Sequence, residues 1–255
     1  MQKNRIRVAR VEGIVLSRRD WGEADRLITL LSPELGKLRV VAPGARKPSS
    51  RKSGHLEIFS RGRFVLARGR TFDKITQAET IDYFPTLRDS LERVSAGYLM
   101  TEMADRFLQE EDPNALVYDL LYEALGWLEA GEPVALVTRF FELRMLGYVG
   151  YQPQLYRCQH CDRGLQPVDQ FFDLREGGVL CPTCRPEGGE LTPLSLNGLK
   201  VLRLLQGAEW SVVRGLRLDD TLADALGDLL HRYTLFQLER ELSSVRFIDD
   251  LRGSG

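Results

Sequence analysis

Four cysteines form the most distinctive pattern in the sequence, because they come in two pairs that each enclose two residues. The pairs are Cys158–Cys161 and Cys181–Cys184, with nineteen residues between them. Two residues between cysteines let both thiolates of a tight turn face one ion, and two such turns complete the tetrahedral sulfur shell that Zn²⁺ accepts. The spacing therefore predicts a zinc site. Iron in a rubredoxin-like site and a redox-active cysteine pair are the alternatives.

A complete shell of four thiolates leaves no open coordination position, so we expect one structural Zn²⁺ per chain and no catalytic zinc. His160 lies inside the first pair and could replace a cysteine, but four cysteines make this unnecessary. The segments 171–174 and 178–180 can form a hairpin between the two pairs, as in a zinc ribbon.

A second chemical feature is the basic charge of the N-terminal region. The 255-residue chain has a formal net charge of −1, but residues 1–75 hold 18 Lys and Arg against 7 Asp and Glu, a net of +11. The remainder holds 17 basic and 29 acidic residues, a net of −12. Such asymmetry is typical of a polyanion-binding domain attached to an acidic body, and a solvated basic surface without a partner is the alternative.

Several of these cations have spacings that suit contact with a phosphate backbone. Lys37 and Arg39 alternate with apolar residues, which places both on one face of a strand, and we expect that face to be exposed. Residues 43–54 form a loop rich in cations and small residues, which can wrap a phosphate backbone. The predicted DNA contacts are Lys37, Arg39, Arg46, Lys47, Arg51, Lys52 and Arg61. Arg61 and Arg63, and Arg68 and Arg70, repeat the two-residue spacing.

Four aromatic residues of the basic region could stack on bases, although in so small a domain each is more often part of the core. They are Trp21, Phe59, Phe64 and Phe72.

Catalytic motifs are missing from the sequence. It contains no G-x-x-x-x-G-K-[ST] phosphate loop, no G-x-G-x-x-G after a strand and no G-x-S-x-G elbow, and it has only three histidines. We therefore expect that the protein has no catalytic residues and is not an enzyme. No run of eighteen apolar residues and no leader with a cleavage site are found, so neither a membrane span nor secretion is expected.

The cations lie within a region of β-type pattern that ends near Tyr83. Five strands are predicted, at 8–16, 26–31, 37–41, 58–67 and 74–83. Five short strands joined by turns favour a small barrel, and the OB-fold is a common nucleic-acid-binding barrel of this kind.

Helical periodicity begins after Pro85. The first helix is expected from an N-cap at Thr86 to Leu108, and further helices are expected at 115–128, 133–146, 195–205 and 218–242. The predicted fold class is thus α+β and multidomain: an OB-fold barrel at 1–83, an α-helical domain at 84–151 and 191–250, and the four-cysteine module inserted at 152–190.

Three N-terminal segments, Gly13–Leu16, Gly22–Leu27 and Gly36–Arg46, closely resemble the signature of the RecO family of recombination mediators. The helical domain interrupted by four cysteines is similar to the zinc-bearing members of that family, and the resemblance spans nearly the whole chain.

The resemblance implies an OB-fold, binding of single- and double-stranded DNA, and annealing of complementary strands. It also implies partnership with RecR and single-stranded-DNA-binding protein, and help in loading RecA during gap and double-strand-break repair in the bacterial cytoplasm, at the nucleoid. By match to the family's basic motif, Lys37, Arg39, Arg46, Arg51 and Lys52 are carried over as DNA contacts. A metal-dependent DNA-processing enzyme and a zinc-ribbon RNA-binding factor are the alternative functions.

Overall fold

The computed structural model describes the backbone of residues 8–186 and 191–253 and, within these ranges, side chains up to residue 239. The chain divides into two compact units, Met1–Val134 (unit 1) and Ala135–Gly255 (unit 2). The barrel therefore shares a unit with the helices that follow it. The division at residues 83, 151 and 190 stays a prediction. Parts of these predicted domains lie outside the described residues, namely segments 1–7 and 187–190 and the side chain of Leu242 in the last predicted helix.

Five strands of unit 1 close into a barrel in the order β1-β2-β3-β5-β4. All neighbouring strands are antiparallel except β3 and β5, which are parallel. The predicted five-stranded OB-fold barrel is confirmed. The strands are β1 (Val8–Trp21), β2 (Asp25–Ser32), β3 (Gly36–Ala42), β4 (Arg61–Ala67) and β5 (Asp73–Asp82).

The long strand β1 closes the barrel because it pairs with two neighbours in turn. Its first half, Val8 to Ile14, pairs with β4, and its second half, Ile14 to Trp21, pairs with β2. A register shift between Val15 and Ser17 bends the strand between the two pairings, as β-bulges do. The barrel interior is filled by apolar side chains from every strand: Val11, Val15, Ile28, Leu30, Val40, Ala42, Phe64, Leu66 and Ile75, with Ala45 and Leu56 from the β3–β4 connection.

In the described part of unit 1, three α-helices follow the barrel: α1 (Pro85–Arg88), α2 (Leu91–Phe107) and α3 (Ala115–Glu129). A short 3-10 helix, η1 (Ser53–His55), lies in the β3–β4 connection. The predicted start of the first long helix at Thr86 is wrong. Ser90 is extended, and its hydroxyl accepts a hydrogen bond from the Arg93 N–H at 3.4 Å, so Ser90 is the N-cap of α2. The third helix, by contrast, begins where the sequence predicts, with Asn114 as its cap.

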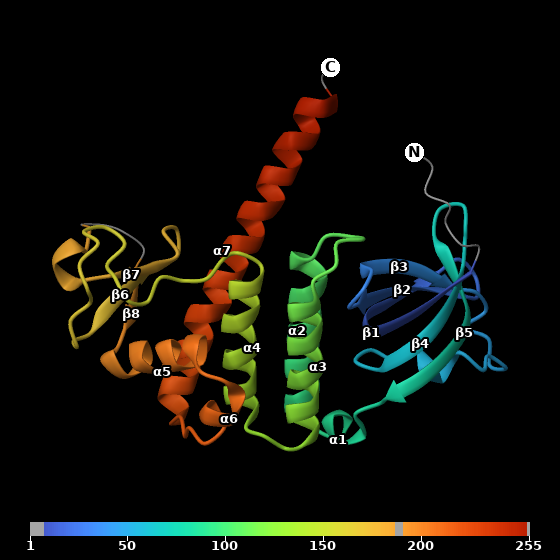
Figure 1. The fold of residues 1–255 in the computed structure, drawn as a ribbon, viewed down its shortest axis with the longest axis horizontal. Helices are drawn as coiled ribbons and strands as arrows, with labels where there is room; N and C mark the ends of the chain where they lie inside the picture. The colour runs from blue at the N-terminus through green and yellow to red at the C-terminus, as the bar shows by residue number, and fades with distance from the viewer. Residues whose placement is uncertain (1–7, 187–190, 254–255) are drawn as a thin grey trace. The chain divides into compact units, whose positions relative to one another are not determined.

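The outer side of the barrel packs against these helices, so β2 is buried on both faces (Figure 1). Residues Leu27 to Ser32 are all buried, although a strand of a small barrel ordinarily shows alternation. At this face the Ser17 hydroxyl donates to the Thr29 hydroxyl at 2.9 Å and lies 3.4 Å from the Asp105 carboxylate of α2. The continuous burial of β2 thus reflects a strand covered on one side by core and on the other by helix.

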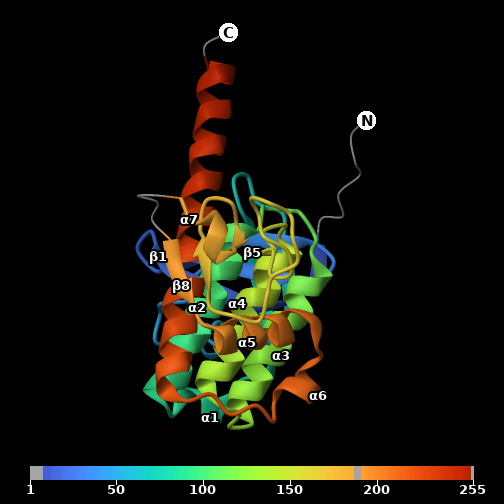
Figure 2. The same cartoon turned by 90° about the vertical axis from the view of Figure 1, so that its left-hand side faces the viewer.

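Unit 2 carries the cysteine module on a helical scaffold (Figure 2). The predicted hairpin is present as β6 and β7, and β8 adds a third strand, in the order β7-β6-β8. Phe172 of β6 is fully buried and packs edge-on against Tyr233 of α7, with ring centroids 5.3 Å apart. The elements are α4 (Val134–Tyr148), β6 (Gln170–Asp173), β7 (Gly178–Leu180), η2 (Pro182–Cys184), β8 (Leu191–Leu194), α5 (Leu196–Gly207), α6 (Trp210–Val213) and α7 (Asp220–Gly253). Among the described helices, none is both long and apolar enough to cross a bilayer.

Candidate nucleic-acid interface and metal centre

Three connections that are far apart in the sequence meet at one end of the barrel. Trp21, at the β1–β2 turn, contacts Phe72 of the β4–β5 turn, with ring centroids 5.6 Å apart. The Arg46 N–H, in the β3–β4 connection, donates to the Ala24 carbonyl at 2.9 Å. Farther along that connection, Lys52 Nζ donates to the Ile75 carbonyl of β5 at 2.9 Å. We call residues 19–25, 43–52 and 68–74 together the loop rim.

The loop rim gathers most of the exposed cations of the barrel. It contains eight Lys and Arg residues against four Asp and Glu, a net charge of +4. All eight cations except Lys52 are exposed. The cations are Arg19, Arg46, Lys47, Arg51, Lys52, Arg68, Arg70 and Lys74. A cluster of this sign attracts a polyanion and holds it through phosphate contacts.

Four sequence-predicted contacts, Arg46, Lys47, Arg51 and Lys52, belong to the loop rim. Arg46 lies 3.4 Å from the Asp20 carboxylate and donates to the Glu23 carbonyl, which fixes the start of the β3–β4 connection. Burial lowers the pKa of the Lys52 ammonium, against the opposing effect of the nearby Asp25 carboxylate. Sequence reasoning noted Arg68 and Arg70 only as a spacing and missed Arg19 and Lys74, because nothing local in the sequence brings the two turns together.

Lys37 does not lie on an exposed face, so that expectation is wrong. The side chain is 7% exposed, its ammonium donates to the Asp105 carbonyl, and Asp105 Oδ1 lies 3.4 Å away. The segment after α2 covers it, because the Glu111 N–H bonds the Lys37 carbonyl at 2.9 Å. Gly36 permits this approach: its φ is +71°, and a Cβ there would lie 2.3 Å from the Asp112 carbonyl oxygen.

Arg39 is exposed as predicted but has a protein partner. Its Nε lies 2.9 Å from a carboxylate oxygen of Glu110, and the two side chains are 43% and 47% exposed. An ion pair so open to solvent is weak, since water competes for both groups. Arg39 can therefore exchange its partner at little cost, whereas Lys37 cannot.

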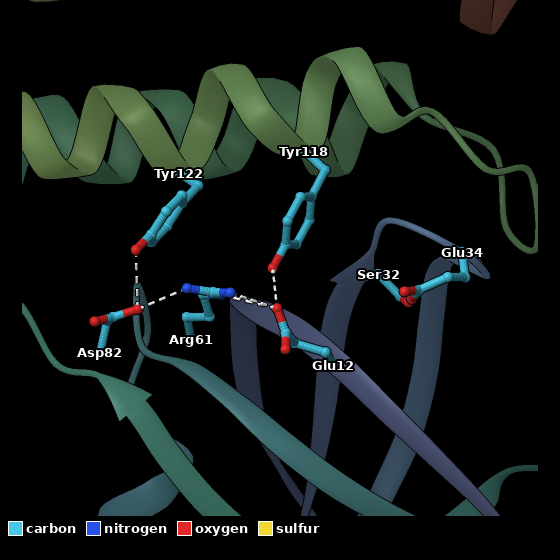
Figure 3. Close-up of polar contacts among 7 residues, drawn as sticks. All are labelled: Glu12, Ser32, Glu34, Arg61, Asp82, Tyr118 and Tyr122. Carbon is cyan, nitrogen blue, oxygen red and sulfur yellow. Dashed lines mark hydrogen bonds and ion pairs between the residues drawn. The ribbon is translucent and has the colours of Figure 1, made fainter.

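Arg61 lies between two carboxylates at the junction of the barrel and α3 (Figure 3). Its guanidinium donates to Glu12 Oε1 at 2.7 Å and to Asp82 Oδ2 at 3.0 Å. The hydroxyls of Tyr118 and Tyr122 donate to the same two carboxylates, at 3.3 and 3.1 Å. Burial opposes charge on Arg61, but the hydrogen bonds to Glu12 and Asp82 raise its pKa above the ordinary value. Arg61 thus has a structural role in fastening α3 to the barrel.

Figure 3 also shows the end of β2 that lies away from the loop rim. There the Ser32 hydroxyl donates to Glu34 Oε2 at 3.2 Å. This bond closes the β2–β3 turn. The turn lies next to the segment that covers Lys37, so this end of the barrel is occupied by protein, whereas seven of the eight cations of the loop rim are exposed within the described part of unit 1.

The four candidate aromatics separate into two pairs. Phe59 and Phe64 are 2% and 1% exposed, so both are core residues. Trp21 is 41% exposed and Phe72 half-buried, and both lie at the loop rim. Arg19 lies over the Trp21 ring at 5.9 Å.

The four cysteines come together as their spacing predicts, and their sulfur atoms could hold one metal ion. Their sulfur atoms all lie within 4.8 Å of one another, and Cys161 and Cys181 are 4.0 Å apart. Zinc–sulfur bonds of about 2.3 Å in a tetrahedron place the sulfurs about 3.8 Å apart, so the cluster fits a metal ion of this type. Burial raises the pKa of the Cys158 thiol, but N–H donors of Cys161, Cys181 and His160 lower it to about 6, which favours the thiolate that a metal requires.

The elements that position the cysteines also tie the module to its scaffold. The first knuckle is closed by the Asp162 N–H bond to the Cys158 carbonyl, and the Gln159 N–H joins it to Val179 of β7 at 3.0 Å. Two cations of the module are already engaged by protein: Arg157 with Asp162, and Arg185 over the Phe171 ring at 4.6 Å.

Comparison with known proteins agrees with this architecture. Residues 6–84 match the family described as Recombination protein O N terminal, and residues 88–246 match Recombination protein O C terminal. A DNA repair protein RecO of Roseiflexus sp. (strain RS-1) is 41% identical over 97% of this chain and 87% of its own length. That of Desulforamulus reducens is 35% identical over 96% of each. One from Dehalococcoides mccartyi (strain CBDB1) is 33% identical over 95% of this chain and 96% of its own length. The chain therefore belongs to the RecO family of DNA repair proteins.

Proposed function

We propose that the protein binds single- and double-stranded DNA through the loop rim and anneals complementary strands. The observation that carries this proposal is the convergence of three connections into one basic surface at one end of the barrel. The loops between strands 1 and 2 and between strands 4 and 5 are the ones that OB-folds use for oligonucleotides. Lys47, Arg51 and Arg46 are the proposed phosphate contacts, with Lys52 at the edge of the surface.

Annealing by such a surface needs no covalent chemistry. Cations that offset the charge of two strands lower their mutual repulsion and raise their local concentration, and base pairing then supplies the driving force. We therefore propose a binding protein and no enzyme. DNA contact by Lys37, Arg39 and Arg61 stays a prediction, and each would have to leave a protein partner to make it.

We propose further that the protein works with RecR and single-stranded-DNA-binding protein to help load RecA on coated DNA in gap and double-strand-break repair. Family membership supports these partners. We place this activity in the bacterial cytoplasm, at the nucleoid, where such DNA is found.

One Zn²⁺ per chain is the proposed occupant of the cysteine site, in a structural role. The sulfur cluster supports a four-thiolate shell, which leaves no position for a substrate. Because β6 of the module packs on α7, the ion would hold the module's sheet in the form that this packing needs.

A strand-annealing assay with fluorescently labelled complementary strands tests the proposal, with and without single-stranded-DNA-binding protein. We expect the double variant Lys47→Glu, Arg51→Glu to anneal poorly. If two phosphate contacts are lost, the slope of log affinity against log salt concentration for a single strand should become shallower by about 1.4. The control is Lys200→Glu, Arg217→Glu, which makes the same charge change at two exposed residues of unit 2.

Equal annealing by the two double variants would contradict the loop rim as the binding surface. A Mg²⁺-dependent cleavage of added DNA that follows the protein through purification would instead support a processing enzyme. A clear preference for structured RNA would support an RNA-binding factor.

A further inference from the structure

Trp21 is a large aromatic residue that the fold leaves open to solvent. It is 41% exposed, whereas Phe59 and Phe64 of the same barrel are almost completely buried. Burying an aromatic side chain is among the most favourable contributions to folding, so an indole left at a turn forgoes part of that gain. Among the described residues, its aromatic contact is with the Phe72 ring, and exposed cations of the loop rim lie on either side of it in the sequence.

Phe72 holds the indole from the other turn of the loop rim. The two rings are perpendicular, with an interplanar angle of 89° and centroids 5.6 Å apart. In this edge-to-face arrangement one ring restricts the other without covering both of its faces. The contact therefore orients Trp21 while part of the indole stays in solvent.

One cation contacts this ring, and a second is paired with the residue before it. The guanidinium of Arg19 lies over it, and Arg46 is held nearby through Asp20, the residue that precedes Trp21. An aromatic face flanked by cations is the arrangement that binds single-stranded nucleic acid, because the bases stack on the ring while the cations contact the phosphates.

We propose that Trp21 is a stacking platform for an unpaired base and that it makes the loop rim favour unpaired over paired DNA. This inference rests on the proposed function, because it assumes that the loop rim binds DNA. Bases inside a duplex have both faces covered by their neighbours, so only an unpaired base offers a face to the indole at no cost of unstacking. Phe72 is a positioning residue, since it acts through Trp21.

Stacking of this kind is compatible with annealing. A base that stacks on Trp21 uses its face and leaves its pairing edge free for a complementary strand. Once the pair forms and the duplex stacks, the base leaves the indole. The platform thus holds a strand open for pairing and releases the paired product.

Two strands of equal length and charge test the proposal: oligothymidylate and an abasic strand that lacks bases. Their affinities for the full chain are measured by fluorescence anisotropy of labelled strands. We expect the wild-type protein to bind oligothymidylate about tenfold more tightly than the abasic strand, in the range that one stacked base contributes. Trp21→Ala should remove this difference and leave abasic and duplex affinities unchanged, and Trp21→Phe should retain part of it.

The control is Tyr83→Ala, which removes an aromatic side chain of similar exposure, 45%, outside the loop rim. It should keep the wild-type preference. Equal binding of both strands by the wild type, or an undiminished preference in Trp21→Ala, would overturn the stacking platform and leave DNA binding intact. A wild-type protein that binds neither strand would overturn the proposed function together with this inference.

Discussion

Replacement of Lys37 by methionine separates a structural role of this residue from a role in DNA binding. The side chain is 7% exposed, and its ammonium bonds the carbonyl and faces the carboxylate of Asp105, which is itself 30% exposed. Methionine fills a similar volume but removes the charge and leaves both Asp105 oxygens without this donor.

The expected cost follows from that geometry. Hydrogen bonds to charged groups contribute about 1.5–3 kcal/mol, and breaking a buried ion pair costs about 3–5 kcal/mol. Because water reaches Asp105, we expect a value near the lower range, roughly 2 kcal/mol. An unfolding entropy of about 2.1 cal/mol/K per residue gives roughly 0.28 kcal/mol/K for a unit of 134 residues, so the melting temperature of unit 1 should fall by about 7 °C.

Differential scanning calorimetry and the salt dependence of DNA affinity provide the two measurements. Lys37→Met should lower the melting temperature without changing the salt dependence. Arg39→Met is the matched control, because it removes a cation two residues away on the same strand whose exposed pair with Glu110 contributes less than about 1 kcal/mol. Two results together would refute the structural assignment and make Lys37 a phosphate contact. They are an unchanged melting temperature for Lys37→Met and a slope of log affinity against log salt that is shallower by about 0.7 for a single strand.

Three further predictions concern other parts of the chain. Arg61→Met should lower the unfolding free energy of unit 1 by roughly 2–3 kcal/mol, because Glu12 and Asp82 lose their shared partner. A loss of less than about 0.5 kcal/mol in denaturant titration would count against the role of Arg61 in fastening α3 to the barrel. Cys158→Ser should remove one equivalent of zinc in metal analysis and destabilise unit 2, while wild-type protein without stoichiometric zinc or iron would contradict the metal centre. Glu142 is almost fully buried, and burial raises its pKa to about 7, although Arg139 Nε lies 2.8 Å from Glu142 Oε2 and opposes the shift. Because the pKa is higher in the folded than in the unfolded protein, this group stabilises unit 2 below about pH 4.5, and the contribution is lost as pH rises through 7. Thermal unfolding at pH 5 and pH 8 should show this loss, and it should be smaller in Glu142→Gln; the same slope in both proteins would assign it to other groups.

Features encoded within a few neighbouring residues could be predicted from the sequence. The two cysteine pairs predicted that four sulfur atoms would cluster, since each knuckle is a local turn. Alternation and turn residues predicted five strands, and their number and length suggested the barrel. The hairpin 171–180 was predicted in the same way, from two short apolar runs.

Features that depend on distant segments could not be predicted. Alternation placed Lys37 and Arg39 on one face of β3, but it contains no information on what covers that face, and Asp105 is 68 residues away from Lys37. The loop rim was missed as a unit for the same reason, because Trp21 and Phe72 meet only once the barrel has closed. The start of α2 was misplaced because the Thr86 and Leu87 N–H groups are bonded by the distant Glu129 of α3, and the long helix begins only after Ser90.

The helical cover on β2 has a consequence for the synthesis of the protein. The last barrel strand ends at Asp82, but the tyrosines that complete the Arg61 cluster follow at 118 and 122 on α3. At about 5–20 residues per second, a ribosome needs roughly 2–8 s to add the intervening 40 residues. During this interval the emerging barrel carries the apolar outer face of β2 in water and Glu12 and Asp82 without their tyrosines. We therefore expect a nascent chain that has emerged from the ribosome only to just beyond residue 83 to require a chaperone, and one that has emerged well beyond residue 130 to be free of that need.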